Sequence, residues 1–282
     1  MPTLILQGSN LNDAAAQKVA QQLQASVVEQ NSTFYRLETS LPVQGGALAE
    51  VRASVEFDIN VLPKGFQPDS VRLLVTDMDS TLINIECIDE IADFLGIKEK
   101  ISEITEAAMN GEIDFETSLT RRVALLKGLD VSALERVYNE RLELNPGAER
   151  MIAGLKAKGI KVALVSGGFT FFTDRLKDRL KLDFTQANVL GVESGLLTGQ
   201  VTGEIVGAEA KSTFLLKLCT DLNIDPSQAV AMGDGANDLK MMTSAGLSVA
   251  YHAKPAVQAE AHTRLNRCGL DGVLGLLGID RS

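Results

Sequence analysis

The sequence predicts an α/β protein with a doubly wound, Rossmann-like parallel sheet, an inserted helical cap and a small N-terminal α/β domain. Short apolar runs rich in β-branched residues occur at 72–76, 161–165 and 229–232, which is typical of buried parallel strands. Amphipathic helical patterns alternate with these runs, as they do in doubly wound sheets. The 282 residues are enough for about two domains.

The first part of the chain reads as a small α/β unit. Residues 3–7 and 33–37 have strand patterns, and residues 12–23 form an alanine-rich helical pattern. The stretch 62–68 contains two prolines and a glycine, a composition that breaks regular structure and often separates domains. We therefore expect an N-terminal domain over 1–66, a candidate for a regulatory role, and a larger domain over 67–282.

The larger domain departs from simple strand–helix alternation in two places. From about 88 to 144 the sequence is charged and helical with no strand pattern, which predicts a helical cap inserted after the first core strand. Residues 184–202 carry apolar and β-branched residues around a Ser-Gly pair, which suggests a hairpin. Helices are expected at 147–158, 171–180, 210–222 and 237–244.

Composition excludes several classes of function. The net charge is −10 and the isoelectric point about 4.8, so the average surface repels nucleic acid and anionic lipid. No apolar run approaches the ~18 residues of a membrane span, and no export signal is evident at the N-terminus. The three cysteines form no Cys-x-x-Cys signature. We expect a cytoplasmic protein with a small-molecule substrate and no nucleic-acid or membrane partner; a homodimer is left open.

A pair of acids follows the first core strand, in Asp77-Met78-Asp79-Ser80-Thr81. Residues two apart in an extended segment point the same way, so Asp77 and Asp79 should project from the carboxyl end of the strand, where open α/β sheets bind ligands. Two close carboxylates repel, which raises the pKa of one of them toward a value useful for general-acid chemistry. Judged alone, such a pair of acids at a strand end could simply begin a loop.

A second acidic group follows the last core strand, in Gly233-Asp234-Gly235-Ala236-Asn237-Asp238. The glycines permit tight turns and close backbone approach. Hard oxygen ligands without nearby His or Cys favour Mg²⁺, which typically takes one or two carboxylates together with substrate phosphate. Judged alone, the segment could instead be a turn before a helix.

Two further features suggest a phosphate site. Ser166-Gly167-Gly168 follows the strand at 161–165 and precedes a helix, and backbone N–H groups beside a hydroxyl at such a place bind phosphate. Lys211 falls in or near the first turn of the helix at 210–222, where a cation opposes the helix dipole unless an anion lies nearby. The alternative for Ser166-Gly167-Gly168 is a simple connecting turn, and the alternative for Lys211 is a solvated surface lysine.

The order of these motifs resembles the haloacid dehalogenase superfamily of phosphohydrolases. Asp-x-Asp-x-Thr comes first, then Ser-Gly-Gly, then Lys, then Gly-Asp-x-x-Asn-Asp, each after the expected element. Within that superfamily the sequence is similar to the phosphoserine phosphatase family, on the first motif with Glu86 downstream, on residues 115–123 in the helical block and on residues 233–238. The resemblance covers about residues 71–277, so the N-terminal domain is not expected to be catalytic.

The resemblance implies a reaction and a metal. Asp77 would be the nucleophile that forms an aspartyl-phosphate, and Asp79 would protonate the leaving oxygen and then activate water. Mg²⁺ would bind the Asp77 carboxylate, the Asp79 backbone carbonyl and Asp234.

The resemblance also implies the residues that hold the phosphoryl group. Ser166, the Gly167 N–H and Lys211 would bind its oxygens, which is the electrostatic stabilisation that phosphoryl transfer needs. Asn237 would position phosphate or substrate, and Asp238 would orient Lys211 or a metal-bound water.

Substrate choice is assigned to two residues by the same resemblance. A free amino acid carries an ammonium and a carboxylate, and Glu86 and Arg122 would bind them respectively. From sequence alone each is more simply a solvated helix charge, and only the motif register favours Arg122 over Arg121. The implied reaction converts O-phosphoserine to serine and phosphate, the last step of serine biosynthesis.

Two other functions fit parts of the pattern. A related phosphatase or phosphotransferase acting on another small phosphate ester would have the same core motifs. A phospho-accepting receiver-like module also surrounds an aspartate with acids, Mg²⁺, a hydroxyl and a lysine. Asp79 and the helical cap disfavour the receiver, because a signalling acceptor needs neither an in-site acid nor a lid over a substrate.

Overall fold

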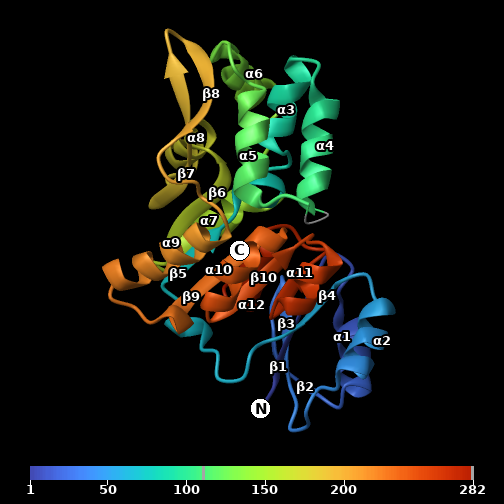
Figure 1. The fold of residues 1–282 in the computed structure, drawn as a ribbon. Helices are drawn as coiled ribbons and strands as arrows, with labels where there is room; N and C mark the ends of the chain where they lie inside the picture. The colour runs from blue at the N-terminus through green and yellow to red at the C-terminus, as the bar shows by residue number, and fades with distance from the viewer. Residues whose placement is uncertain (110–111, 281–282) are drawn as a thin grey trace.

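The computed structural model describes residues 1–109 and 112–280. Figure 1 shows a small N-terminal sheet with two helices beside a larger sheet, and a group of helices that stands over one end of the larger sheet. None of the helices in the described ranges combines the length and the apolar character needed to cross a membrane.

The N-terminal sheet is antiparallel, in the order β2-β3-β1-β4. The strands predicted at 3–7 and 33–37 and the helix at 12–23 are present, whereas β2, α2 and β4 were not predicted. Most of β2 is exposed, so it has no clear apolar alternation to detect. The elements are β1 (Thr3–Gln7), α1 (Asp13–Gln22), β2 (Ser26–Gln30), β3 (Phe34–Glu38), α2 (Gly45–Ala53) and β4 (Asp58–Val61).

The larger sheet has seven strands in the order β11-β10-β9-β5-β6-β7-β8. All neighbouring pairs are parallel except β7 and β8, which form the expected hairpin, so the sheet is mixed and mainly parallel rather than wholly parallel. The strands are β5 (Leu73–Thr76), β6 (Lys161–Phe169), β7 (Phe184–Glu193), β8 (Leu196–Thr202), β9 (Ala229–Gly233), β10 (Leu247–Tyr251) and β11 (Thr263–Leu265).

Helices cover both faces of this sheet because successive strand side chains point to opposite faces. Leu73 and Val75 of β5 pack in one core cluster, and Leu74 packs in the other. The first cluster includes residues of α9 (Ala208–Asp221), α10 (Leu239–Ser244) and α11 (Pro255–Glu260); the second includes α7 (Ala148–Ala157), α8 (Thr170–Leu180) and α12 (Gly272–Leu276). The short α11 and α12 and the strands β10 and β11 were not predicted.

In the described part of the cap, between β5 and α7, there are four helices: α3 (Cys87–Phe94), α4 (Lys98–Met109), α5 (Phe115–Ala124) and α6 (Ser132–Glu140). Asp114 begins α5 by accepting a hydrogen bond from the Thr117 N–H at 2.7 Å. The two linkers to the cap run antiparallel through a bridge between Ile83 and Leu144. In Figure 1 the β7–β8 hairpin stands beside the cap helices, and β8 contacts α5.

The two sheets are joined edge to edge through side chains. Asn60 on β4 donates to the Arg264 carbonyl at 2.9 Å and accepts from the Arg264 N–H at 2.8 Å, as a neighbouring strand would. Asp58, which is 5% exposed, accepts three backbone N–H bonds from residues 266–268. The N-terminal domain is therefore fixed to the β11 edge of the core.

Candidate active site

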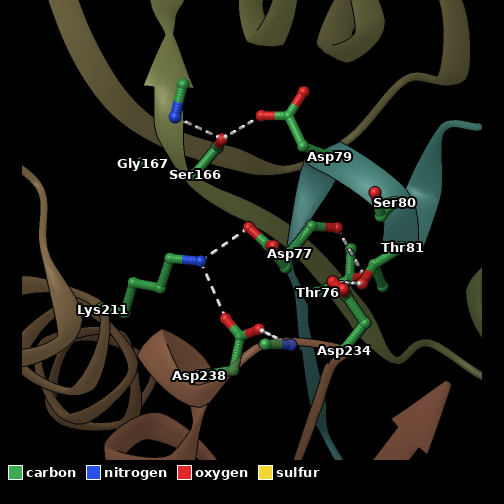
Figure 2. Close-up of polar contacts among 12 residues, drawn as sticks. Thr76, Asp77, Asp79, Ser80, Thr81, Ser166, Gly167, Lys211, Asp234 and Asp238 are labelled. Carbon is green, nitrogen blue, oxygen red and sulfur yellow. Dashed lines mark hydrogen bonds and ion pairs between the residues drawn. The ribbon is translucent and has the colours of Figure 1, made fainter. Parts of the chain in front are cut away.

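The predicted motifs meet at the carboxyl ends of three adjacent strands. β5 lies between β6 and β9, and the chain winds outward from β5 in both directions, which makes this edge the topological switch point of the sheet. Asp77 follows β5, Ser166 lies near the carboxyl end of β6, and Asp234 follows β9. Figure 2 shows these side chains directed toward one another, with Lys211 entering from α9.

Asp77 and Asp79 have different partners although both follow β5. Asp77 Oδ1 accepts a hydrogen bond from Lys211 Nζ at 2.7 Å. Asp79 Oδ2 accepts one from Ser166 Oγ at 3.3 Å, and its Oδ1 accepts one from the Cys87 N–H at 2.9 Å. Ser80, which directly follows Asp79, lies in the left-handed region with φ of 56°. The two carboxylates therefore face different parts of the site (Figure 2).

Lys211 is completely buried and bridges two carboxylates. Its Nζ donates to Asp77 Oδ1 at 2.7 Å and to Asp238 Oδ1 at 2.8 Å. Burial opposes the charged form of Lys211, but Asp238 and Asp77 more than offset it, so the pKa of Lys211 is raised. Its position in the first turn of α9, where the helix dipole repels a cation, is thus compensated by anions, as the sequence suggested.

Burial governs the charge of both motif aspartates. Burial and repulsion from Asp238 raise the pKa of Asp77 well above its usual value, although Lys211 opposes the shift. Burial also raises the pKa of Asp79, and the Cys87 N–H works against it by stabilising the carboxylate. A site with one carboxylate paired to a cation and another without such a pair can provide both a nucleophile and a proton donor.

Three carboxylates form a cluster with metal-ligand spacing. Oxygen atoms of Asp77, Asp234 and Asp238 lie within 4.8 Å of one another, and Thr81 Oγ1 holds Asp234 by donating to its Oδ1 at 2.9 Å. A Cβ at Gly233 would lie 2.3 Å from Asp238 Cγ, so only glycine lets this carboxylate approach. An all-oxygen donor set fits a hard divalent cation.

The cluster differs in one respect from the expected ligands. Asp238 was expected to orient Lys211 or a metal-bound water and not to be a metal ligand. Its carboxylate lies in the cluster and also accepts a hydrogen bond from Lys211. The Asp79 side chain is directed to Ser166 and Cys87 instead, so any contribution of Asp79 to a cation would come from its backbone, as expected.

The Ser166–Gly168 segment belongs to the end of β6 instead of a turn, and the predicted helix follows it as α8 from Thr170. Ser166 Oγ accepts the Gly168 N–H at 2.8 Å, and the Gly167 carbonyl accepts from Asn188 Nδ2 at 2.8 Å. A Cβ at Gly168 would lie 2.7 Å from Asp79 Oδ2, which explains the glycine there. Because the segment stays extended, Ser166 lies beside Asp79 rather than at a helix start.

Asn188 was missed by sequence reasoning. Its side chain is 1% exposed and ties the Gly167 carbonyl to the Val206 N–H, the latter at 2.8 Å. The only sequence signal was an amide in the middle of β7, two residues after another amide at Gln186. Cys87, which donates its backbone N–H to Asp79, was missed as well because it lies within the helical block.

A cavity of about 620 Å³ lies between this group and the cap. Glu86 borders it, and Ser80 Oγ donates to Glu86 Oε1 at 2.7 Å. Burial of the Glu86 carboxylate raises its pKa to about 7, and the negative charge of Asp79 contributes to the increase. The residues that line the cavity include Asp77, Asp79, Glu86, Phe115, Ser118, Arg122, Ser166, Gly167, Asp234, Asn237 and Lys254.

Arg122 lies on the pocket side of α5, whereas Arg121 is exposed on another side. Arg122 Nε donates to the Ser118 carbonyl one turn earlier at 3.4 Å. Burial lowers the pKa of Arg122, and the negative charges of Asp89 and Glu86 oppose this. The structure therefore brings the residue favoured by motif register, and not its neighbour, to the cavity.

A larger cavity of about 890 Å³ lies elsewhere, between the N-terminal sheet, the linker around Pro63 and the end of α12. It contains none of the motif residues. The chemistry of the motifs thus belongs to the smaller cavity under the cap.

Comparison with known proteins gives the same assignment. The model of the haloacid dehalogenase-like hydrolase family matches residues 71–246. Phosphoserine phosphatase from Polaromonas sp. is 54% identical over 224 residues, which are 78% of this chain and 95% of that protein. The crystal structure of a probable phosphoserine phosphatase from Vibrio cholerae has a TM-score of 0.86 and 40% identity, and covers 98% of this chain and 86% of that one.

A structure of a phospho-aspartyl intermediate analogue of phosphoserine phosphatase matches with a TM-score of 0.69 and 41% identity, over 73% of this chain and 98% of that one. The family match over residues 71–246 includes the motif residues gathered at the carboxyl ends of β5, β6 and β9. The chain therefore belongs to the haloacid dehalogenase-like hydrolases and, within them, to the phosphoserine phosphatase family.

Proposed function

We propose that this protein hydrolyses O-phosphoserine to serine and inorganic phosphate through an aspartyl-phosphate on Asp77. The observation that supports this most is the buried Asp77–Lys211–Asp238 bridge at the switch point of the sheet, with a second acid, Asp79, on the substrate side. Relatives that bear the name of this activity share the fold and about half of the aligned residues.

The first step transfers the phosphoryl group to Asp77. A carboxylate oxygen of Asp77 forms a bond to phosphorus while the bond from phosphorus to the serine oxygen breaks. Asp79 gives its proton to that departing oxygen, so serine leaves as a neutral alcohol. Burial of Asp79 raises its pKa and thereby favours the protonated form that this step requires.

The second step returns the enzyme to its starting state. The Asp79 carboxylate, now ionised, takes a proton from water as the water oxygen attacks phosphorus. The bond between phosphorus and Asp77 breaks, and phosphate is released with Asp77 as a carboxylate. Asp79 ends the cycle protonated, so protons and charges balance.

The carboxylate cluster is suited to Mg²⁺. Asp77 and Asp234 with the Asp79 backbone carbonyl would hold the ion, and Asp238 would add a negative charge at its edge. When bound, the ion would neutralise the charge between the anionic nucleophile and the anionic phosphate. The cluster supports a divalent cation, and Mg²⁺ is the identity that we assign from the donor chemistry.

The phosphoryl oxygens would be held by groups already in place. Ser166 Oγ, the Gly167 N–H and Lys211 Nζ lie at the ends of β6 and α9 on the side of Asp77. Asn237 lines the same cavity, and Asp238 positions Lys211 through the 2.8 Å hydrogen bond. Fixed donors of this kind stabilise the charge of the transition state without reorganisation.

Glu86 and Arg122 would bind the amino-acid part of the substrate. Glu86 carries the negative charge that suits an ammonium, and the fork of Arg122 suits a carboxylate. Both border the cavity from the cap side, away from the Lys211 bridge. A phosphatase or phosphotransferase for another small ester remains the second candidate, because the strand-end residues would serve either reaction.

The function is tested by phosphate release from O-phosphoserine with added Mg²⁺, and EDTA should stop the reaction. Asp77→Asn should lower kcat by at least about 1,000-fold, because the amide is a poor nucleophile. Asp178→Asn, an exposed acid-to-amide change on α8, serves as the matched control and should have wild-type activity. Near-normal turnover by Asp77→Asn would exclude this nucleophile, and phosphate passing mainly to added alcohols would favour the phosphotransferase.

A further inference from the structure

Ser118 carries a buried hydroxyl without a partner in the described part of the chain. The residue is on α5 and only 1% exposed. Its Oγ is buried and forms no hydrogen bond with any described residue. Buried hydroxyls in proteins are nearly always hydrogen-bonded, and an unpaired one destabilises the folded chain. Such a group in a binding cavity indicates that its partner arrives with a ligand.

The hydroxyl belongs to the wall of the active-site cavity. Ser118 lines it together with Arg122, Phe115 and Glu86. Arg122 is four residues later on α5, so both side chains are on the same side of the helix. The 3.4 Å hydrogen bond from Arg122 Nε to the Ser118 carbonyl fixes the guanidinium beside this turn.

The position of Ser118 indicates which group of an amino-acid phosphate its hydroxyl would contact. The phosphoryl group belongs beside Lys211 and Ser166 at the strand ends, and the ammonium belongs beside Glu86, which is held by Ser80 before α3 begins. The substrate carboxylate would then lie beside the turn of α5 that carries Arg122. A carboxylate accepts about four hydrogen bonds, so a bidentate guanidinium leaves sites free for a hydroxyl.

We propose that the Ser118 hydroxyl donates a hydrogen bond to the substrate carboxylate and, with Arg122, selects phosphorylated amino acids over phosphate esters that lack a carboxylate. This assignment rests on the proposed function and adds a specificity residue to it. Selection by a hydroxyl is effective because the ester without a carboxylate leaves this buried group unpaired.

The test compares Ser118→Ala with the wild type on three substrates: phosphoserine, phosphoethanolamine, which lacks the carboxylate, and O-phospho-3-hydroxypropionate, which lacks the ammonium. The variant should lose about 10- to 100-fold in kcat/KM for both carboxylate-bearing substrates, the factor for a hydrogen bond to a charged group. The loss with phosphoethanolamine should be less than about 2-fold, since a carboxylate is absent.

Two variants and one physical measurement complete the design. Thr120→Ala removes a hydroxyl from an exposed position of the same helix and should behave as the wild type on all three substrates. Arg122→Ala should show the same substrate pattern as Ser118→Ala with a larger loss. Ser118→Ala should unfold at the same temperature as the wild type or a higher one, because it removes an unpaired buried hydroxyl.

Each other outcome overturns the assignment. Equal losses on all three substrates, or a lowered unfolding temperature, would show that Ser118 is needed for packing. A loss confined to the two ammonium-bearing substrates would assign the hydroxyl to the ammonium. Wild-type kinetics would show that it binds nothing. Failure of the wild type to prefer phosphoserine over phosphoethanolamine would instead count against the proposed function, which the Ser118→Ala results alone cannot do.

Discussion

Asp77 and Asp79 show how two identical side chains acquire different chemistry. Asp77 is paired with Lys211, which favours the carboxylate needed for attack on phosphorus. Burial raises the pKa of both carboxyl groups, but Asp79 has a hydroxyl and an N–H as partners instead of the hydrogen bond from Lys211, so it can carry a proton. The difference arises within three residues: Asp77 lies against Lys211 of α9, whereas Asp79 lies against Ser166 of β6 and the start of α3.

Glu86 gives a prediction for pH dependence. Burial raises the pKa of Glu86 to about 7, so the carboxylate is protonated below that pH and ionised above it. Only the ionised form attracts an ammonium. We therefore expect kcat/KM for phosphoserine to fall relative to that for O-phospho-3-hydroxypropionate as the pH drops through about 7. Steady-state kinetics across that range measure the ratio.

The second substrate is the control, because its phosphate titrates in the same range while it has no ammonium to bind. In Glu86→Gln the ratio should be low and independent of pH. A ratio that stays constant in the wild type as the pH is lowered would contradict an ammonium site at Glu86.

At the scale of elements, the two linkers between core and cap are held together by hydrogen bonds. Asn145 Nδ2 donates to the Thr81 carbonyl at 2.8 Å and the Ile83 carbonyl at 3.0 Å. Thr81 also holds Asp234, so the linkers connect the base of the cap to the carboxylate cluster. The pocket residues on α5 therefore depend on these linkers for their distance from the strand ends.

Asn145→Ala should lower the free energy of unfolding by about 1–3 kcal/mol, because two backbone carbonyls lose their donor. It should also raise KM for phosphoserine as the cap loses its fixed orientation. Urea unfolding and steady-state kinetics measure the two effects. Asn84→Ala is the matched control: its side chain is exposed and, among the described residues, accepts only the Glu143 N–H, so it should have the smaller effect. Equal effects of the two variants would show that Asn145 does not join the linkers.

At the scale of the whole molecule, the N-terminal domain is joined to the larger domain by apolar packing and by buried polar groups. Ile5 and Phe34 belong to the same apolar cluster as residues of α12. Asp58 accepts backbone N–H bonds from Asn266 at 3.0 Å, Arg267 at 3.1 Å and Cys268 at 2.9 Å. Asn266 also donates its side-chain amide to Gln258 on α11, next to Val257 in the cavity wall. The contact between the sheets thus reaches one wall of the active site.

Asp58→Ala should lower the free energy of unfolding by about 2–3 kcal/mol, because it leaves buried N–H groups without an acceptor. Chemical unfolding followed by circular dichroism measures the loss. Glu56→Ala removes an exposed ion pair with Arg267 in the same interface and should cost less than about 1 kcal/mol. If both variants were equally stable, the buried carboxylate would not anchor the domain.

The sequence alone determined three of the parallel strands, the helical insertion, the hairpin and the place of the chemistry. β5, β6 and β9 are buried on both faces and read as continuous apolar runs. Acids that directly follow such strands must lie at the carboxyl edge of the sheet, so Asp77 and Asp234 could be placed without coordinates. The domain boundary near residue 66, the cytoplasmic location and the roles of individual residues stay predictions.

Only the tertiary structure decided which groups touch. Lys211 and Asp77 are 134 residues apart, and their hydrogen bond depends on how α9 packs against the sheet. The same holds for Asn188 behind Gly167 and for Ser118, which resembles any polar helix residue until the cap covers it. A local pattern records which side of an element is apolar. Contacts between distant segments are set by packing, which no local pattern contains.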